Sequence, residues 1–132
     1  SGADSTIKGI YTYPNGDVYE GTWKADKRHG KGKMTYKRDG DFYVGDWKDG
    51  EKHGEGVFRF LAKEQEYKGL FKNGKFEGQG TYMWEDSDKE TKQTYEGNFH
   101  LGKKQDQNAL FTFTNGDTAH GVWKDDKFMK WK

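Results

Sequence analysis

The sequence predicts an all-β protein, a single extended, twisted antiparallel β-meander built of repeated hairpins. One indication is a recurring pentapeptide with glycine at its centre and an aromatic ring last, whose glycines are 24, 24, 28 and 24 residues apart. A fixed period of this length is typical of stacked units that contact only their neighbours. Large and polar residues also alternate with period two, the period of a strand. Asn-Gly and Asp-Gly pairs, which tolerate the positive φ of hairpin turns, separate the alternating segments. The five copies are Tyr19–Trp23, Tyr43–Trp47, Tyr67–Phe71, Tyr95–Phe99 and the degenerate Ala119–Trp123.

A second half completes each of the first three repeats. It is a Gly-x-Gly followed by alternating large residues, as in Gly30–Tyr36, Gly54–Phe60 and Gly78–Trp84. The same half stands alone near the amino end, at Gly9–Tyr13. This organisation predicts about ten or eleven strands in sequential order, with helix at most in the tail. The single domain 1–132 then divides into a half repeat 7–18, repeats 19–42, 43–66, 67–94, 95–118 and 119–127, and a tail 124–132 that caps the open edge strand.

Composition indicates a thin fold held together by rings. Only 30% of the residues are hydrophobic, and nine Phe, eight Tyr and five Trp stand against ten Val, Ile and Leu. Most of the 19 glycines lie at fixed repeat positions beside these rings, where they leave notches for neighbouring side chains. We therefore expect Gly45→Val or Gly69→Val to cost about 1–3 kcal/mol through overpacking.

Charge and residue types argue against several classes of function. The net charge of +1 gives no bulk field for nucleic acid, and the sequence has no cysteine for disulfides. His29 and His53 occupy equivalent positions two strands apart, about 10 Å, too far to share a metal ion. Asp86–Glu90 lacks the glycine and distant glutamate of a calcium loop. We expect no catalytic, cofactor or metal site and no nucleic-acid partner, and a cytoplasmic location, with cytoskeletal or membrane association left open.

The motifs resemble one known family. Tyr19–Lys24, together with Lys27–Gly32 and Tyr13–Asp17, resembles the MORN repeat (membrane occupation and recognition nexus), and the resemblance extends from about Lys8 to Lys127. It implies a meander of one hairpin per repeat, twisted and curved into a groove. Relatives of the repeat occur in radial spoke heads of cilia, junctophilins and plant phosphatidylinositol phosphate kinases. This spread implies that the repeat itself is not the catalyst.

Two segments depart from the repeat pattern. Between Trp84 and Tyr95 the linker grows to ten residues, 85–94. In the fourth repeat the Gly-x-Gly is lost, and Gln107–Ala109 stands in its place. We expect the sheet to be distorted there, or the chain to serve a particular contact.

The resulting hypothesis is a non-catalytic scaffold or adaptor whose curved aromatic sheet binds a helix or extended segment of a partner protein. We expect the last rings of the pentapeptides to be mainly structural, and the hydroxyls of their tyrosines to reach water or a ligand. Phe111 and Phe113 would form a local anchor. The predicted partner-binding residues are Tyr19, Tyr43, Tyr67, Tyr95, Phe111 and Phe113.

Other functions stay open. The family name implies peripheral membrane binding through phosphoinositides, but acidic residues interleave with the lysines, so binding to anionic lipid would be weak. The chain could also be an accessory region of a larger protein, and homo-oligomerisation is open. The charged face opposite the rings is the second candidate surface. The predicted lipid contacts are Lys124, Lys127, Lys130, Trp131 and Lys132.

Overall fold

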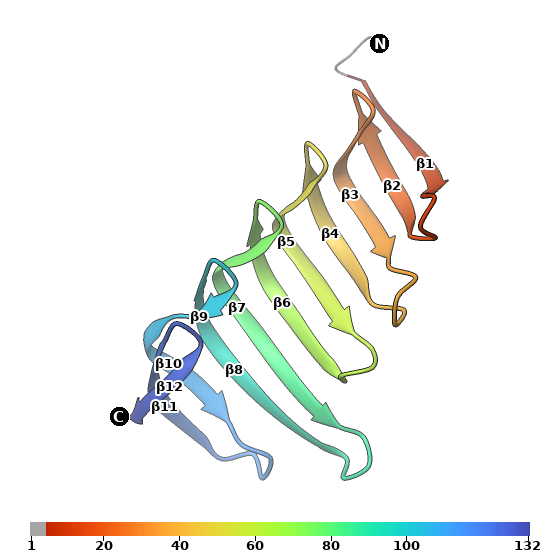
Figure 1. Cartoon of the computed structure of the whole chain (residues 1–132). Coiled ribbons are helices and arrows are strands. Elements are labelled where there is room, and N and C mark those ends of the chain that lie inside the picture. Colours follow the sequence, from red (N-terminus) through yellow and green to blue (C-terminus); the bar gives the residue numbers. More distant parts are fainter. Residues whose placement is uncertain (1–4) are drawn as a thin grey trace.

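The computed structural model describes residues 5–132, which form one open antiparallel sheet of 12 strands and no helix (Figure 1). The strands follow one another in chain order, which confirms the predicted all-β meander. The sheet is drawn out, with β1 at one end and β12 at the other. No helix in this part of the chain is long and apolar enough to cross a membrane. The strands are β1 (Thr6–Thr12), β2 (Val18–Lys24), β3 (Lys27–Thr35), β4 (Phe42–Lys48), β5 (Glu51–Phe60), β6 (Gln65–Lys72), β7 (Lys75–Asp86), β8 (Thr91–His100), β9 (Lys103–Lys104), β10 (Asp106–Thr112), β11 (Thr118–Lys124) and β12 (Lys127–Trp131).

The fourth repeat is where the meander is interrupted. Its returning strand is split into β9 and β10, both paired with β8, with β9 lying off the main path of the sheet. Asp106 holds the break, because its carboxylate accepts hydrogen bonds from the backbone N–H groups of Asn98 at 2.7 Å and Asn108 at 2.7 Å. The distortion expected at this repeat is therefore present, and it raises the strand number above the predicted ten or eleven.

Residues 85–94 were predicted to be a linker, but only 87–90 form a turn, and the rest belongs to strands. β7 extends to Asp86 and β8 begins at Thr91, so these two strands form the longest hairpin of the sheet. Glu85 pairs with Lys92 and Asp86 with Thr91 across the hairpin. Opposite charges on facing strands stabilise such pairing, so the segment continues the sheet without apolar alternation.

Two-residue turns join the strands inside each repeat and tie neighbouring repeats together. Asn73 and Gly74 have φ values of 51° and 80°, the geometry of a type I′ hairpin turn. The Gly74 N–H donates to the Lys52 carbonyl of the preceding hairpin at 3.0 Å. Equivalent bonds join Gly50 to Arg28, Gly102 to Phe76 and Asp126 to Lys104, at 2.9, 3.0 and 2.9 Å.

The two glycines of each Gly-x-Gly serve different purposes. Gly54, the first, has a φ of 68° at the register shift between β4 and β5, a conformation that other residues rarely adopt. Gly56, the second, lies under the Tyr43 ring, which a Cβ at this position would overlap. Gly56 belongs to a row of glycines paired across the sheet, comprising Gly9, Gly21, Gly32, Gly45, Gly56, Gly69, Gly80 and Gly97.

The core is a chain of rings on the face above this glycine row. Tyr43 meets Trp47 of its own repeat edge to face at 5.1 Å between ring centroids, and Phe71 of the next repeat at 4.9 Å. The same contact to the next repeat recurs along the sheet, so the core is continuous although each repeat touches only its neighbours. It joins Tyr19 to Trp47, Tyr67 to Phe99 and Tyr95 to Trp123, with centroids 5.3, 5.0 and 5.0 Å apart.

Candidate binding groove on the aromatic face

The tyrosines of the pentapeptides are structural, which corrects the expectation that their hydroxyls reach water or a ligand. Tyr19, Tyr43, Tyr67 and Tyr95 are each 0% exposed. Their hydroxyls donate to the backbone carbonyls of Thr22, Asp46, Leu70 and Asn98 at 2.9, 2.7, 2.7 and 2.8 Å. In the first three repeats the accepting residue lies where the register of the hairpin shifts. Each hydroxyl is therefore committed to the backbone.

Burial also changes the chemistry of these phenols. It raises the pKa of Tyr19 to about 12, and it raises the pKa values of Tyr43, Tyr67 and Tyr95 further still. The last rings of the pentapeptides are buried as expected: Trp47 is 4% exposed, Phe71 3% and Phe99 2%, whereas Trp23 is half-buried. None of the four tyrosines has surface to offer a partner in this structure.

Half-buried rings from the second half of each repeat lie on the same face. We call them the aromatic row. Neighbouring members touch from one hairpin to the next: centroids are 5.7 Å apart for Tyr36 and Phe58, 6.5 Å for Phe60 and Tyr82, and 6.2 Å for Trp84 and Phe111. The aromatic row comprises the half-buried Tyr36, Phe58, Phe60, Tyr82, Trp84, Phe111 and Phe113, together with Trp131, which is 43% exposed.

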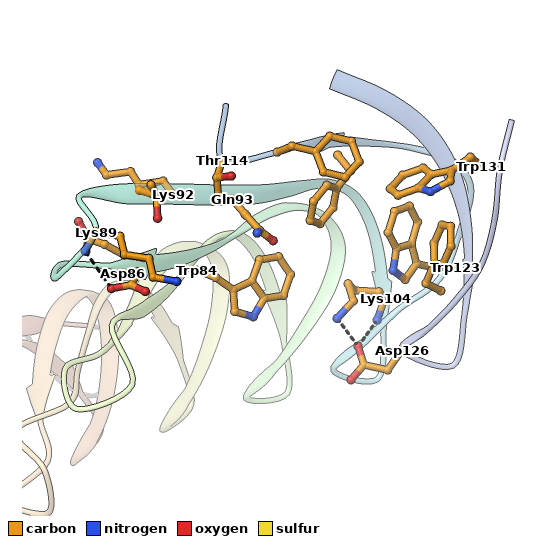
Figure 2. A pocket seen from close by; sticks show the side chains of 15 residues that line it. Trp84, Asp86, Lys89, Lys92, Gln93, Lys104, Thr114, Trp123, Asp126 and Trp131 are labelled. Atoms are coloured by element: carbon orange, nitrogen blue, oxygen red, sulfur yellow. Dashed lines mark hydrogen bonds and ion pairs between the residues drawn. The ribbon is translucent and has the colours of Figure 1, made fainter. Parts of the chain in front are cut away.

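The aromatic row ends in a groove at the carboxyl end of the sheet, with a volume of about 870 Å³. Figure 2 shows Trp84 of β7 on one side of it, and Trp123 of β11 and Trp131 of β12 on the other. Phe111 and Phe113, the predicted anchor, line this groove and contact each other at 5.1 Å. The long β7–β8 hairpin contributes Asp86, Lys89, Thr91 and Lys92 to it, so this hairpin and the rings of the irregular fourth repeat meet here.

An ion pair lies in this groove. The Lys104 ammonium is 3.1 Å from the Asp126 carboxylate and 5.2 Å from the centre of the Trp84 ring. Burial acts to raise the Asp126 pKa, but hydrogen bonds from the Lys104 backbone and side chain outweigh it and hold that pKa below its usual range. The charge of Lys104 is therefore neutralised by Asp126 (Figure 2).

The tail adds the last strand of the sheet. β12 pairs with β11, with Val122 opposite Lys130 and Gly121 opposite Trp131. Adjacent residues of a strand point to opposite faces, so Trp131 joins the aromatic row while Lys130 projects from the other face. Lys124 ends β11, Lys127 begins β12, and Lys132 follows the end of β12. The five predicted lipid contacts are exposed. Lys124 pairs with Lys127, and Lys130 pairs with Val122 two residues before Lys124, so these three lysines share the face opposite Trp131.

The opposite face carries mixed charge. Lys31 forms an ion pair with Asp46, and Arg59 with Glu85 at 2.8 Å. Val44 and Leu70 are exposed between the charged side chains, at 43% and 39%. Among residues 5–132 no group of three or more His, Cys, Asp or Glu side chains is placed to hold a metal ion.

Comparison with known families now places the chain. MORN repeats are matched at residues 8–18, 19–40, 43–60 and 67–89, just over half of the chain. The chain therefore belongs to the MORN repeat family. MORN repeats are a non-enzymatic repeat type, generally found in modules for protein–protein or membrane association. A search of curated proteins gave no match.

Sequence reasoning missed most of the aromatic row. It ranked the pentapeptide tyrosines as the binding residues and treated the rings after each Gly-x-Gly as strand residues. The signal was present, because those rings also alternate with polar residues on the same face. The pentapeptide tyrosines are buried and the rings of the aromatic row are more exposed, and this difference in burial depends on the register shifts of the hairpins.

Proposed function

We propose that the chain is a non-catalytic scaffold or adaptor that binds an extended or helical segment of a partner protein along the aromatic row. The observation that carries this proposal is the continuous line of rings from Tyr36 to Trp131, ending in a groove of about 870 Å³. Fully buried rings beneath them already hold the sheet together. The aromatic row is thus additional apolar surface on the same face.

Its residue types and rigidity suit a protein ligand. Aromatic side chains dominate the energetics of protein interfaces, above all where neighbouring contacts exclude water. Members of the row are held against one another, as with Tyr82 and Trp84 at 4.8 Å and Phe113 and Trp131 at 5.2 Å. A surface already ordered before binding loses little conformational entropy when a segment docks on it.

Charge favours a protein segment over a bilayer. The groove at the carboxyl end holds Asp86 and Asp126 as well as lysines, and Asp126 is paired with Lys104. Anionic headgroups need an excess of basic residues on one surface, and the chain carries a net charge of only +1. Peripheral membrane binding is the second candidate, supported by Phe128 and Met129 of β12, which are 45% and 55% exposed beside lysines.

Peptide selection tests the proposal. A displayed library of random peptides is selected on the immobilised protein, and recovered peptides are measured by calorimetry. We expect Trp84→Ala and Phe113→Ala to weaken binding at least about tenfold, because each removes a central ring contact. Val44→Ala and Leu70→Ala, on the opposite face, are the matched controls. Thermal unfolding of each variant separates loss of binding from loss of fold.

The proposal fails if no peptide is recovered, or if the peptides bind the Trp84→Ala and Phe113→Ala proteins as tightly as the wild type. Weakening by Val44→Ala and Leu70→Ala alone would move the binding site to the opposite face.

A further inference from the structure

One equivalent position on the aromatic face of the repeats holds a cation in some repeats, although the core does not require a charge there. It is the second residue after each two-residue turn, and it lies opposite the last ring of the pentapeptide. Phenylalanine fills it in two repeats and a cation in three, so the fold accepts either. The five residues are Arg28, Lys52, Phe76, Lys104 and Phe128.

Two of the three cations lack a counter-charge. Lys104 has Asp126 at 3.1 Å, but among residues 5–132 no carboxylate lies within ion-pair distance of Arg28 or Lys52. Both side chains are half-buried and line one groove of about 590 Å³ at the amino end of the aromatic face. Arg28 and Lys52 therefore form a positive site without a paired carboxylate, whereas Lys104, at the equivalent position of the fourth repeat, is paired with Asp126.

Arg28 is fixed in place with donors to spare. Its guanidinium carbon lies 4.9 Å from the centre of the Trp47 ring and 5.6 Å from that of Tyr13. Nη2 donates to the Gly50 carbonyl at 2.7 Å and Nη1 to the Tyr13 hydroxyl at 3.4 Å. A guanidinium carries further N–H groups, so Arg28 can still donate to an acceptor in the groove.

Lys52 sits in a cage of rings. Its ammonium donates to the Tyr36 hydroxyl at 3.3 Å. Burial among the rings, and then the charge of Arg28, hold the pKa of Lys52 below its ordinary value, so the ammonium is held at a cost that an anion would relieve. The rings of Tyr36, Tyr43, Trp47 and Phe58 have their centres 5.8, 5.7, 5.9 and 5.6 Å from the ammonium nitrogen.

Two acidic residues border the groove without neutralising it. Asp17 accepts hydrogen bonds from the Lys37 backbone N–H and the Asn15 amide, at 3.0 and 3.1 Å. Glu51 is exposed, and its charge on Lys52 is outweighed by burial and by Arg28. Both would repel a doubly charged phosphate more than a single carboxylate. The groove therefore favours a monoanion.

We propose that Arg28 and Lys52 form a subsite for one aspartate or glutamate side chain of the partner segment. This inference rests on the proposed function, because it supplies the chemistry of one position of the segment that the aromatic row binds. The rings of Tyr13, Tyr36 and Trp47 reduce the access of water, which strengthens an ion pair formed between them. The two ends of the aromatic face then differ: an unpaired positive site lies at the amino end, and a ring-lined groove in which Asp126 pairs with Lys104 lies at the carboxyl end. A bound segment has one orientation.

The first test uses a probe that needs no partner. Acetyl-glutamate amide is titrated into ¹⁵N-labelled protein while the Arg28 Nε–H and Trp47 indole N–H resonances are followed by NMR, with acetyl-glutamine amide as its neutral counterpart. We expect saturable shifts with the glutamate compound only, and none in the Arg28→Gln/Lys52→Gln protein. Equal shifts with both compounds, or no shift with either, overturn the subsite.

The second test repeats the peptide selection on the wild type and on the Arg28→Gln/Lys52→Gln protein. We expect the wild type to recover peptides with an acidic residue at a constant distance from an apolar one. Replacing that acid by its amide should weaken binding about tenfold on the wild type and leave it unchanged on the double variant. Lys33→Gln/Lys68→Gln, which removes two charges from the opposite face, is the control and should behave as the wild type.

The two proposals fail in different ways. Peptides that bind the aromatic row with no acidic preference overturn the subsite and leave the scaffold function standing. Shifts with the glutamate compound but no recovered peptide overturn the scaffold function and leave the carboxylate site. Vesicles of phosphatidylcholine with phosphatidylserine that bind the wild type but not the Arg28→Gln/Lys52→Gln protein would assign the anion to a lipid headgroup and overturn the peptide carboxylate.

Discussion

Replacing Gly56 by alanine tests the contact on which the core depends. The added methyl group would overlap the Tyr43 ring. That ring has nowhere to move: it is 0% exposed, its hydroxyl donates to the Asp46 carbonyl at 2.7 Å, and Trp47 and Phe71 meet it at 5.1 and 4.9 Å. The methyl group fits only if the ring shifts and the hydroxyl bond is lost.

The expected loss of stability follows from three contributions. Overpacking of a dense core costs about 1–3 kcal/mol, and losing the buried hydroxyl bond costs about 1 kcal/mol more. Alanine also restricts the unfolded chain, which offsets about 0.4–1 kcal/mol. We expect the free energy of unfolding to fall by about 2–3 kcal/mol, which corresponds to roughly 10 °C in Tm for a domain of this size.

Gly9 is the matched control, because it belongs to the same row of glycines. The nearest atom to a Cβ there is Trp23 Nε1 at 3.6 Å, an ordinary contact, so Gly9→Ala should stay within about 0.5 kcal/mol of the wild type. Urea unfolding followed by circular dichroism measures both variants. The reasoning is refuted if Gly56→Ala unfolds at the wild-type midpoint, or if Gly9→Ala loses as much stability. In a Tyr43→Leu background the added methyl group should cost less, because the ring that it displaces is gone.

Three further predictions concern charge. The pKa of Tyr19 is about 12 in the folded protein and about 10 in the unfolded chain, so folding is favoured by keeping this phenol neutral. This contribution to the free energy of unfolding is complete below pH 10 and falls by about 2–3 kcal/mol at pH 12. Absorbance at 295 nm and circular dichroism should therefore change together, and phenolate forming in a folded protein would contradict this. Lys52→Met should raise the free energy of unfolding at pH 7 by about 1 kcal/mol, because it removes a half-buried cation beside Arg28. Urea unfolding measures this change, and a lower urea midpoint would mean that the cation–π contacts of Lys52 outweigh the cost of burying its charge. Sedimentation of the protein with phosphatidylserine vesicles should be weak and should disappear at high salt, because exposed charges are screened. Binding that survives high salt and is lost in the Lys130→Gln/Lys132→Gln protein would contradict this and would assign membrane binding to the tail.

The local parts of this fold were accessible from the sequence, because they depend on neighbouring residues. Period-two alternation and turns such as Asn73–Gly74 specify hairpins, and a constant repeat length specifies their order. Two turns were missed, Ala25–Asp26 and Asp125–Asp126, although their residues adopt the same positive φ values. Neither turn contains a glycine, so both lack the Asn-Gly or Asp-Gly pair that identifies such a turn.

Depth within the aromatic face was not accessible in the same way. Tyr43 and Tyr82 are the same residue type in the same alternation, yet Tyr43 is fully buried and Tyr82 only half-buried. The difference arises at the shifted hairpin register, where the Asp46 carbonyl accepts the Tyr43 hydroxyl, whereas the Tyr82 hydroxyl donates to Gln65 at 2.6 Å. Such a register shift depends on residues of two strands, so it cannot be predicted from the sequence of either strand alone.

The Arg28–Lys52 pair could be predicted from the sequence only in part. The two residues are one repeat length apart and hold the same position after their turns. Their proximity therefore follows from the repeat, and an alignment of the repeats would have brought them together. That no carboxylate within residues 5–132 forms an ion pair with them follows only from the packed structure.

With a segment bound along the aromatic row as proposed, the regular spacing of ring contacts between repeats would fix the length of segment that each repeat meets. Each repeat meets the next through the same contact, at 5.3, 4.9, 5.0 and 5.0 Å, so a repeat can be gained or lost without a new kind of interface. One repeat contributes two strands, about 10 Å across the sheet. That distance corresponds to about three residues of an extended segment or about seven of a helix lying along the aromatic row. The number of hairpins would thus set the length of ligand that is read, and changing that number would retune the length in steps of fixed size.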